Sequence, residues 1–189
     1  MQKLNLPNKL TLIRMFLAPI YLALMLIEFP CHYIVALAVF AVASLTDMLD
    51  GKIARKNNLI TVFGKLPEKT LPPAALLAFM REGWCSIWIV MIVLTREFAV
   101  AGVRLIATAQ GIVIPANYWG KAKTVSQMVF TIVIMLLAEL DATFDIFANA
   151  GWFTLARVSN IMLWITAVLT VVSGITYFVD SKKLIDFSK

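Results

Sequence analysis

The sequence predicts an all-α integral membrane protein, built as a bundle of six transmembrane helices. Of its 189 residues, 61% are hydrophobic and 15% are charged, and the mean hydropathy is +0.86. Soluble domains are about half apolar and about a quarter charged, so this composition excludes an ordinary soluble domain. Apolar segments recur along the chain, and Lys and Arg gather in alternate connections between them. No linker or low-complexity segment divides the chain, so we expect residues 1–189 to form one membrane domain.

Five apolar segments are long enough to cross the hydrocarbon core of a bilayer, which takes about 20 residues of helix. They lie at about 10–29, 33–50, 86–106, 124–140 and 158–179. A further segment at 70–80, TLPPAALLAFM, is shorter. At about 1.5 Å per residue it covers only about half of the core. Its paired prolines, Pro72 and Pro73, supply no backbone N–H donors.

The positions of Lys and Arg indicate that the short segment crosses as well. With six crossings and both termini in the cytoplasm, only Arg81 and Arg157 lie outside, and every other Lys and Arg lies inside. Cytoplasmic loops carry the excess of Lys and Arg, so this distribution favours six crossings with an unusually short third helix. The net charge of +6 is then concentrated on the cytoplasmic face. Such a face would contact anionic lipid or form a pocket for phosphates.

Two aspartates at the end of the second apolar segment are the strongest sign of chemistry. Asp47 and Asp50 are one helical turn apart, and Gly51 and Ala54 continue the same face. Carboxylates close to hydrocarbon are costly and usually mark a functional site. Two on one face suit a hard cation such as Mg²⁺, which prefers oxygen ligands and is often shared with substrate phosphates. The alternative is that both aspartates are solvated at a helix end and that Gly51 ends the helix.

The residues around these aspartates carry a more specific pattern. The stretch TDMLDGKIARKNNLITVFGK resembles the signature of the CDP-alcohol phosphotransferase family. The positions that match in identity and spacing are Asp47, Asp50, Gly51, Ala54, Arg55 and Gly64. The resemblance implies a six-helix membrane fold with its active site facing the cytoplasm. It also implies that CDP-diacylglycerol lies against Gly51, Ala54, Arg55 and Gly64.

The chain departs from the family signature at its last two aspartates. Glu68 stands where the third aspartate is expected, and Pro72 stands where the fourth is expected. The resemblance implies that Asp47, Asp50 and Glu68 hold two Mg²⁺ or Mn²⁺ ions. It implies a general base at position 72, where a proline cannot accept a proton. Two interpretations stay open, an active enzyme or a catalytically impaired member that keeps the fold and the CDP-diacylglycerol site.

Three further stretches resemble the phosphatidylglycerophosphate synthases of this family. They are NLPNKLTLIRMFLAPIY near the start, TREFAVAGVRL at 95–105 and GKAKTVSQM at 120–128. The resemblance implies transfer of a phosphatidyl group from CDP-diacylglycerol to sn-glycerol 3-phosphate, with release of CMP, in a bacterial inner membrane.

An acceptor that carries a phosphate needs cations to bind it. Arg offers a bidentate fork for phosphate and Lys offers a point charge. The candidates on the predicted cytoplasmic side are Arg96, Arg104, Lys121, Lys123 and, as a weaker candidate, Arg14. The alternative is that these charges only set the topology. We expect Glu97 to orient one of the arginines rather than to take part in chemistry.

Other classes of function are less well supported by the sequence. A small cation-coupled transporter would hold its acids near the membrane midplane, whereas Asp47 and Asp50 lie at the edge beside a basic segment. The sequence contains no nucleic-acid-binding motif. A homodimer is an expectation from the family resemblance alone. Cys31 and Cys85 form no CxxC pair, and we expect neither to have a chemical role.

Overall fold

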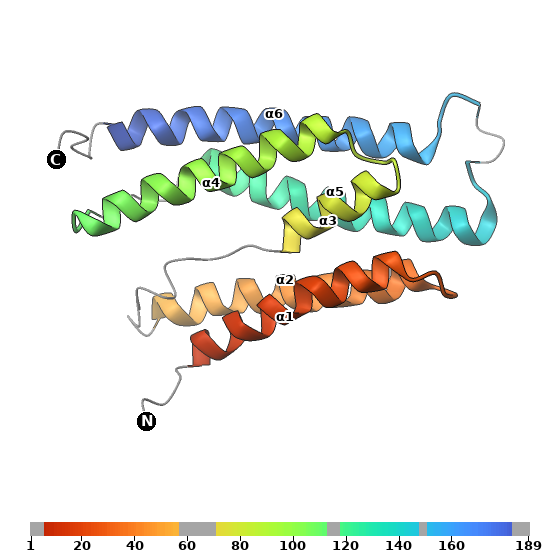
Figure 1. Ribbon diagram of the computed structural model, residues 1–189, viewed down its shortest axis with the longest axis horizontal. Helices are drawn as coiled ribbons and strands as arrows, with labels where there is room; N and C mark the ends of the chain where they lie inside the picture. The colour runs from red at the N-terminus through yellow and green to blue at the C-terminus, as the bar shows by residue number, and fades with distance from the viewer. Residues whose placement is uncertain (1–5, 57–70, 113–117, 148–150, 183–189) are drawn as a thin grey trace.

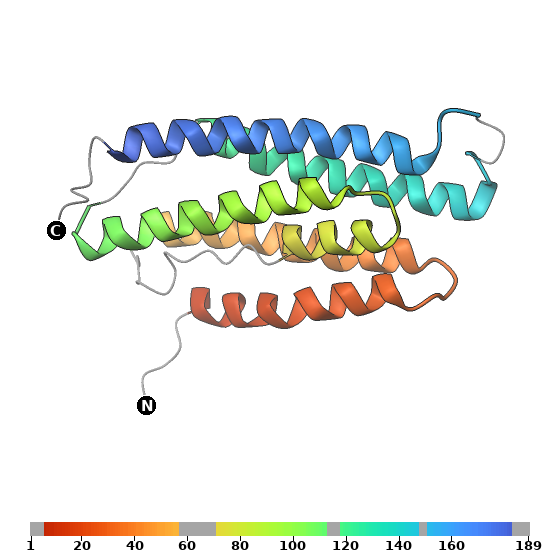
Figure 2. The same cartoon turned by 45° about the horizontal axis from the view of Figure 1, so that its top comes forward.

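Six α-helices form an elongated bundle in which consecutive helices run in opposite directions (Figures 1 and 2). The computed structural model describes residues 6–56, 71–112, 118–147 and 151–182, with the backbone alone for 6–12, 14–15 and 47–56. The described residues contain no strand. The helices are α1 (Leu6–Leu26), α2 (His32–Lys56), α3 (Leu71–Arg81), α4 (Ile87–Ala109), α5 (Tyr118–Phe144) and α6 (Leu155–Lys182).

Each of the six predicted apolar segments is helical, and the third is the shortest. Helix α3 has 11 residues, so it is about 16 Å long at the rise of an α-helix. Within the described part of the chain, α5 and α6 are long and apolar enough to span a membrane. Arg96, Glu97 and Arg104 interrupt the apolar sequence of α4. Six crossings and cytoplasmic termini remain predictions.

The structure corrects the ends of the first two predicted segments. Helix α1 ends at Leu26 rather than at 29. Phe29 precedes a proline, a position that disfavours helix, and Cys31 has a φ of 61°, in the left-handed region. Helix α2 continues past Asp50 to Lys56, so the interpretation that Gly51 ends the helix is wrong. Hydropathy marks only the apolar part of a helix, and this extension is polar.

Helices α3 and α4 both end in a Schellman motif with glycine in the left-handed conformation. After α3, Gly83 has a φ of 74°, and the Trp84 N–H donates to the Phe79 carbonyl at 2.8 Å. After α4, Gly111 has a φ of 73°, and the Ile112 N–H donates to the Ala107 carbonyl at 2.8 Å. A φ in this range costs glycine little, which is why glycine is favoured there. The turn after α3 holds this short helix against α4.

The apolar core includes residues from all six helices, and α3 lies inside it. Leu76 and Phe79 of α3 are fully buried, and this helix packs on α1, α4 and α5. Tyr21 of α1 packs on Phe40 of α2 with ring centroids 5.8 Å apart. The Tyr21 hydroxyl lies 3.5 Å from the Met135 sulfur of α5. The core therefore joins both halves of the bundle.

The outer surface of the bundle is strongly apolar. The most exposed large apolar side chains on the helices include Phe16, Trp88, Phe98, Tyr118 and Phe144. Soluble monomers rarely expose apolar surface of this extent, because it is costly in water. Small polar residues instead lie inside, above all on α6, where Ser159, Thr166, Thr170 and Ser173 are buried. Small and hydroxyl side chains between helices are typical of membrane bundles. The surface and the two long apolar helices support a membrane-embedded protein.

Candidate functional site

The aspartate motif lies on continuous helix near the end of α2. Asp47, Asp50, Gly51 and Ala54 are all within its helical backbone, which places the two aspartates one turn apart, as expected. Their side chains are outside the described part of the structure. Figure 1 shows that α2 finishes at the end of the bundle where α4 and α6 finish and α5 begins. The motif is therefore directed to the same end as the predicted cationic residues of α4 and α5.

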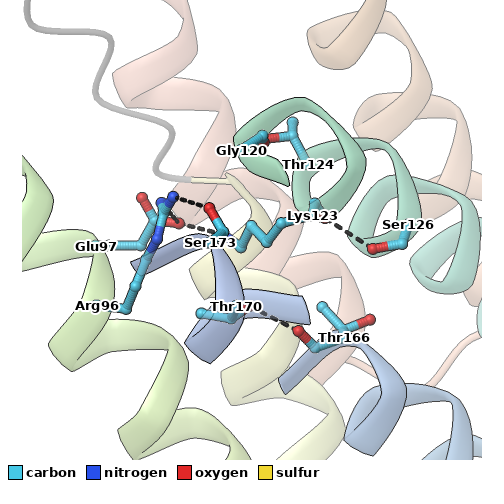
Figure 3. A network of polar contacts seen from close by, with 9 residues as sticks. All are labelled: Arg96, Glu97, Gly120, Lys123, Thr124, Ser126, Thr166, Thr170 and Ser173. Carbon is cyan, nitrogen blue, oxygen red and sulfur yellow. Dashed lines mark hydrogen bonds and ion pairs between the residues drawn. The ribbon is translucent and has the colours of Figure 1, made fainter. Parts of the chain in front are cut away.

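Three helices bring a cluster of charged side chains together, midway along α4 and near the start of α5 (Figure 3). Arg96 and Glu97 reach from α4 toward Lys123 of α5 and Ser173 of α6. The Lys123 ammonium donates to Glu97 Oε1, and Arg96 Nη1 lies 3.4 Å from the same oxygen. Arg96 Nη2 donates to the Ser173 hydroxyl at 2.6 Å. Glu97 contacts Arg96, which the expectation that it orients one of the arginines requires.

The cluster is largely removed from solvent. The side chains of Lys123, Arg96 and Glu97 are 5%, 14% and 30% exposed to solvent, respectively. Charges at such depth need partners, because burying an unpaired charge is costly. One carboxylate lies between two cations, so these three residues together carry a net positive charge. Such a net charge favours an anion such as a phosphate over a cation.

The other predicted cations lie apart from this cluster. Lys121 and Arg104 are exposed. Lys121 lies two residues before Lys123 and so points to a different side of α5. Arg104 lies two turns beyond Arg96, about 12 Å along the helix axis. The Arg14 side chain, Gly64 and Glu68 are outside the described residues.

Pro72 lies in the first turn of α3 and is half-buried. A proline there is well placed for the helix, because the first turn leaves backbone N–H groups unpaired in any case. It offers no group that can take a proton. The side chains that the structure describes include no group of three His, Cys, Asp or Glu residues able to hold a metal.

Ser173, Gly120 and Gly174 are part of the cluster but were not predicted from the sequence. A Cβ at Gly120 would lie 3.7 Å from Ser173 Oγ and 3.9 Å from Arg96 Nη2. A Cβ at Gly174 would lie 3.2 Å from Arg96 Cγ, which is tighter than ordinary contact. The one signal in the sequence was the adjacent Ser and Gly in the apolar part of α6. Such small residues mark places where another helix or side chain approaches closely.

Comparison with known proteins identifies the family. Residues 4–172 match the family model for CDP-alcohol phosphatidyltransferase. The chain belongs to this family. A Bacillus subtilis (strain 168) relative named CDP-diacylglycerol--glycerol-3-phosphate 3-phosphatidyltransferase is 37% identical over 92% of this chain and 93% of its own length. A Rickettsia bellii (strain RML369-C) relative of the same name is 32% identical over 95% of this chain and 96% of its own length.

A third relative of this chain comes from Mycobacterium tuberculosis (strain CDC 1551 / Oshkosh). It is named probable phosphatidylglycerophosphate synthase, and it is 38% identical over 66% of this chain and 63% of its own length. The family resemblance seen in the aspartate motif is therefore confirmed. Similarity to named transferases along nearly the whole chain favours the transferase interpretation over a transporter.

Proposed function

We propose that this chain transfers a phosphatidyl group from CDP-diacylglycerol to sn-glycerol 3-phosphate and releases CMP. In this reaction a glycerol hydroxyl attacks the phosphorus that carries diacylglycerol, the bond from that phosphorus to CMP breaks, and the hydroxyl proton leaves. The names of the Bacillus and Rickettsia relatives support this reaction. The main support for the proposal is the buried cationic pair of Arg96 and Lys123. Lys123 lies in the second turn of α5, which begins at the end of the bundle where α2 finishes.

The donor side of the site would be formed by α2. Gly51 and Ala54 have almost no side chain, so a cytidine diphosphate could approach the helix backbone closely. Arg55 and, outside the described residues, Gly64 complete the proposed donor contacts. Asp47 and Asp50 would face the diphosphate from one side of the helix.

A divalent cation, Mg²⁺ or Mn²⁺, is part of the proposal. Asp47 and Asp50 fit such an ion, because they are hard oxygen ligands one turn apart on a continuous helix. Glu68 is the proposed third ligand and lies outside the described residues. When bound, the cation would neutralise the diphosphate and stabilise the leaving CMP.

The acceptor side would be formed by α4 and α5. Arg96 and Lys123 would attract the phosphate of glycerol 3-phosphate from within the bundle, while Glu97 fixes both side chains. The exposed Arg104 and Lys121, and Arg14 on α1, would draw the anion toward this end of the bundle by their charge. Holding the acceptor phosphate would place the glycerol hydroxyl against the donor, which is the main contribution these residues can make.

The membrane arrangement is also a proposal. We infer six crossings of a bacterial inner membrane, with the catalytic end on the cytoplasmic side. The start of α1 and the finish of α6 lie at the same end of the bundle, which supports both termini on one side (Figure 1). One domain over 1–189 and a homodimer complete the proposed organisation.

The substitution at position 72 predicts a lowered rate. General base catalysis typically contributes about 10²–10⁴-fold, and Pro72 cannot supply it. A catalytically impaired member that binds CDP-diacylglycerol is therefore the second candidate, and Pro72 is the observation that favours it.

An acceptor panel tests the proposal directly. The purified protein would receive CDP-diacylglycerol and Mg²⁺ with glycerol 3-phosphate, serine, inositol phosphate or phosphatidylglycerol in separate reactions. Mass spectrometry of the lipid products should show phosphatidylglycerophosphate in the first reaction alone. Product with another acceptor and none with glycerol 3-phosphate would reject the assignment.

A further inference from the structure

Ser173 of α6 forms a hydrogen bond with Arg96 of α4. Its hydroxyl accepts a hydrogen bond from Arg96 Nη2 at 2.6 Å, and the serine itself is 1% exposed. Ser173 is on α6 and Arg96 is on α4, so this contact joins two of the helices that form the cluster (Figure 3). A short hydrogen bond from a charged donor is stronger than one between neutral groups.

We propose that Ser173 is a positioning residue, which fixes the Arg96 guanidinium for the acceptor phosphate. This inference rests on the proposed function, because it concerns the same acceptor site. Ser173 lies one residue beyond the segment that matches the family model, so the family match does not point to it.

A neutral partner suits this role better than a second carboxylate would. Glu97 already shares its single negative charge between Arg96 and Lys123. The Ser173 hydroxyl orients the guanidinium without cancelling its charge, so the cluster keeps a net positive charge for an anion. Among the described residues, the Arg96 Nε–H is buried and has no acceptor. Arg96 therefore has donor capacity left after its contacts with Ser173 and Glu97.

Two glycines, Gly174 and Gly120, also border the Arg96 side chain. Gly174 lies against the Arg96 stem, where a Cβ would be 3.2 Å from Cγ. Gly120 faces both Ser173 Oγ and Arg96 Nη2. Glycine within a helix lowers helix stability, and at Gly174 its presence is explained by the space that the Arg96 stem occupies. At Gly120 an added Cβ would be in ordinary van der Waals contact with Ser173 and Arg96. Ser173, Gly174 and Gly120 together form a seat for Arg96, which we call the Arg96 seat.

The test compares Ser173→Ala with Ser159→Ala in steady-state assays of CMP release. Ser159 is also fully buried on α6, and its hydroxyl has no hydrogen-bond partner among the described residues, so it is a matched control. We expect Ser173→Ala to raise the KM for glycerol 3-phosphate about tenfold, the cost of one hydrogen bond to a charged group. The KM for CDP-diacylglycerol and kcat should change less than about twofold, since the donor lies elsewhere. Ser159→Ala should change none of the three.

A double variant separates positioning from general packing. If Ser173 acts through Arg96, adding Ser173→Ala to Arg96→Lys should raise the KM for glycerol 3-phosphate little further. An unchanged KM in Ser173→Ala, an equal rise in the KM of both substrates, or a full additive effect would each overturn the inference.

Calorimetry keeps the inference testable if turnover is absent. Binding of glycerol 3-phosphate without donor should be about tenfold weaker in Ser173→Ala than in the unmodified protein. Weaker binding by Ser173→Ala, with no turnover by the unmodified protein, would reject the proposed function and keep the inference. Turnover with unchanged binding in Ser173→Ala would reject the inference and keep the function.

Discussion

Replacing Lys123 by methionine should destabilise the bundle, whereas the same change at Lys121 should not. Lys123 is 5% exposed and donates to Glu97, and Lys121 is exposed on the same helix. Methionine preserves most of the side-chain length and removes the charge together with its N–H donors. Lys123→Met therefore removes the buried ammonium that donates to the Glu97 carboxylate.

The magnitude follows from the burial of the pair. Removing one member of a buried ion pair costs about 3–5 kcal/mol. Glu97 is 30% exposed and keeps Arg96 at 3.4 Å, so the remaining carboxylate is partly compensated. We therefore expect a loss at or just below the low end of this range, about 2–3 kcal/mol, which lowers Tm by about 5–10 °C for a chain of this size. Lys121→Met should stay within about 0.5 kcal/mol, as for most surface changes.

Thermal unfolding in detergent or lipid nanodiscs, followed by tryptophan fluorescence, measures this difference. Both variants should bind glycerol 3-phosphate more weakly, because each loses a cation near the site. Only Lys123→Met should lose stability. Equal Tm values for the two variants would show that the Lys123–Glu97 pair does not stabilise the fold, and the description of the cluster would be refuted.

Three other predictions concern α3, α6 and the turn after α3. Pro72→Asp should raise kcat if position 72 needs a proton acceptor, and an unchanged pH–rate profile with unchanged kcat would contradict that role. Gly174→Ala should raise the KM for glycerol 3-phosphate more than Gly120→Ala, because its Cβ lies 3.2 Å from the Arg96 stem and the Gly120 Cβ lies no closer than 3.7 Å to its neighbours. Equal effects of the two substitutions would contradict the close packing of the Arg96 seat. Burial raises the pKa of the Cys85 thiol from 9.0 to about 12, so Cys85 should stay protonated and resist iodoacetamide at pH 8–9 while the exposed Cys31 reacts. As the pH rises past 9, an unfolded chain would release this proton and the folded chain would not, so the protein should lose stability. Mass spectrometry of the labelled peptides checks the order of reaction, and equal labelling would contradict it.

The helices could be predicted because hydropathy is a local property of the chain. Each apolar segment is helical in the structure, including the short α3 at Leu71–Arg81. The ends of the helices could be predicted less accurately. Helix α2 continues for a polar stretch to Lys56, which hydropathy does not register, although its residues are compatible with helix.

Only part of the candidate site could be predicted from the sequence. Glu97 follows Arg96 directly, so one carboxylate beside two nearby arginines could be expected to contact one of them, although neighbours on a helix do not share a face. Lys123 is 26 residues from Glu97, and Ser173 is 77 residues from Arg96, so these pairs depend on how α4, α5 and α6 pack. Helical spacing alone would have separated Lys121 from Lys123, because residues two apart do not share a helix face.

The most direct test of the account is CMP release by the purified protein compared with its Asp50→Ala variant. Both would receive CDP-diacylglycerol, glycerol 3-phosphate and Mg²⁺. We expect turnover by the unmodified protein that requires glycerol 3-phosphate, and none by Asp50→Ala, because the proposed cation site loses a ligand. Equal turnover by the two proteins would contradict the placement of the site at the end of α2.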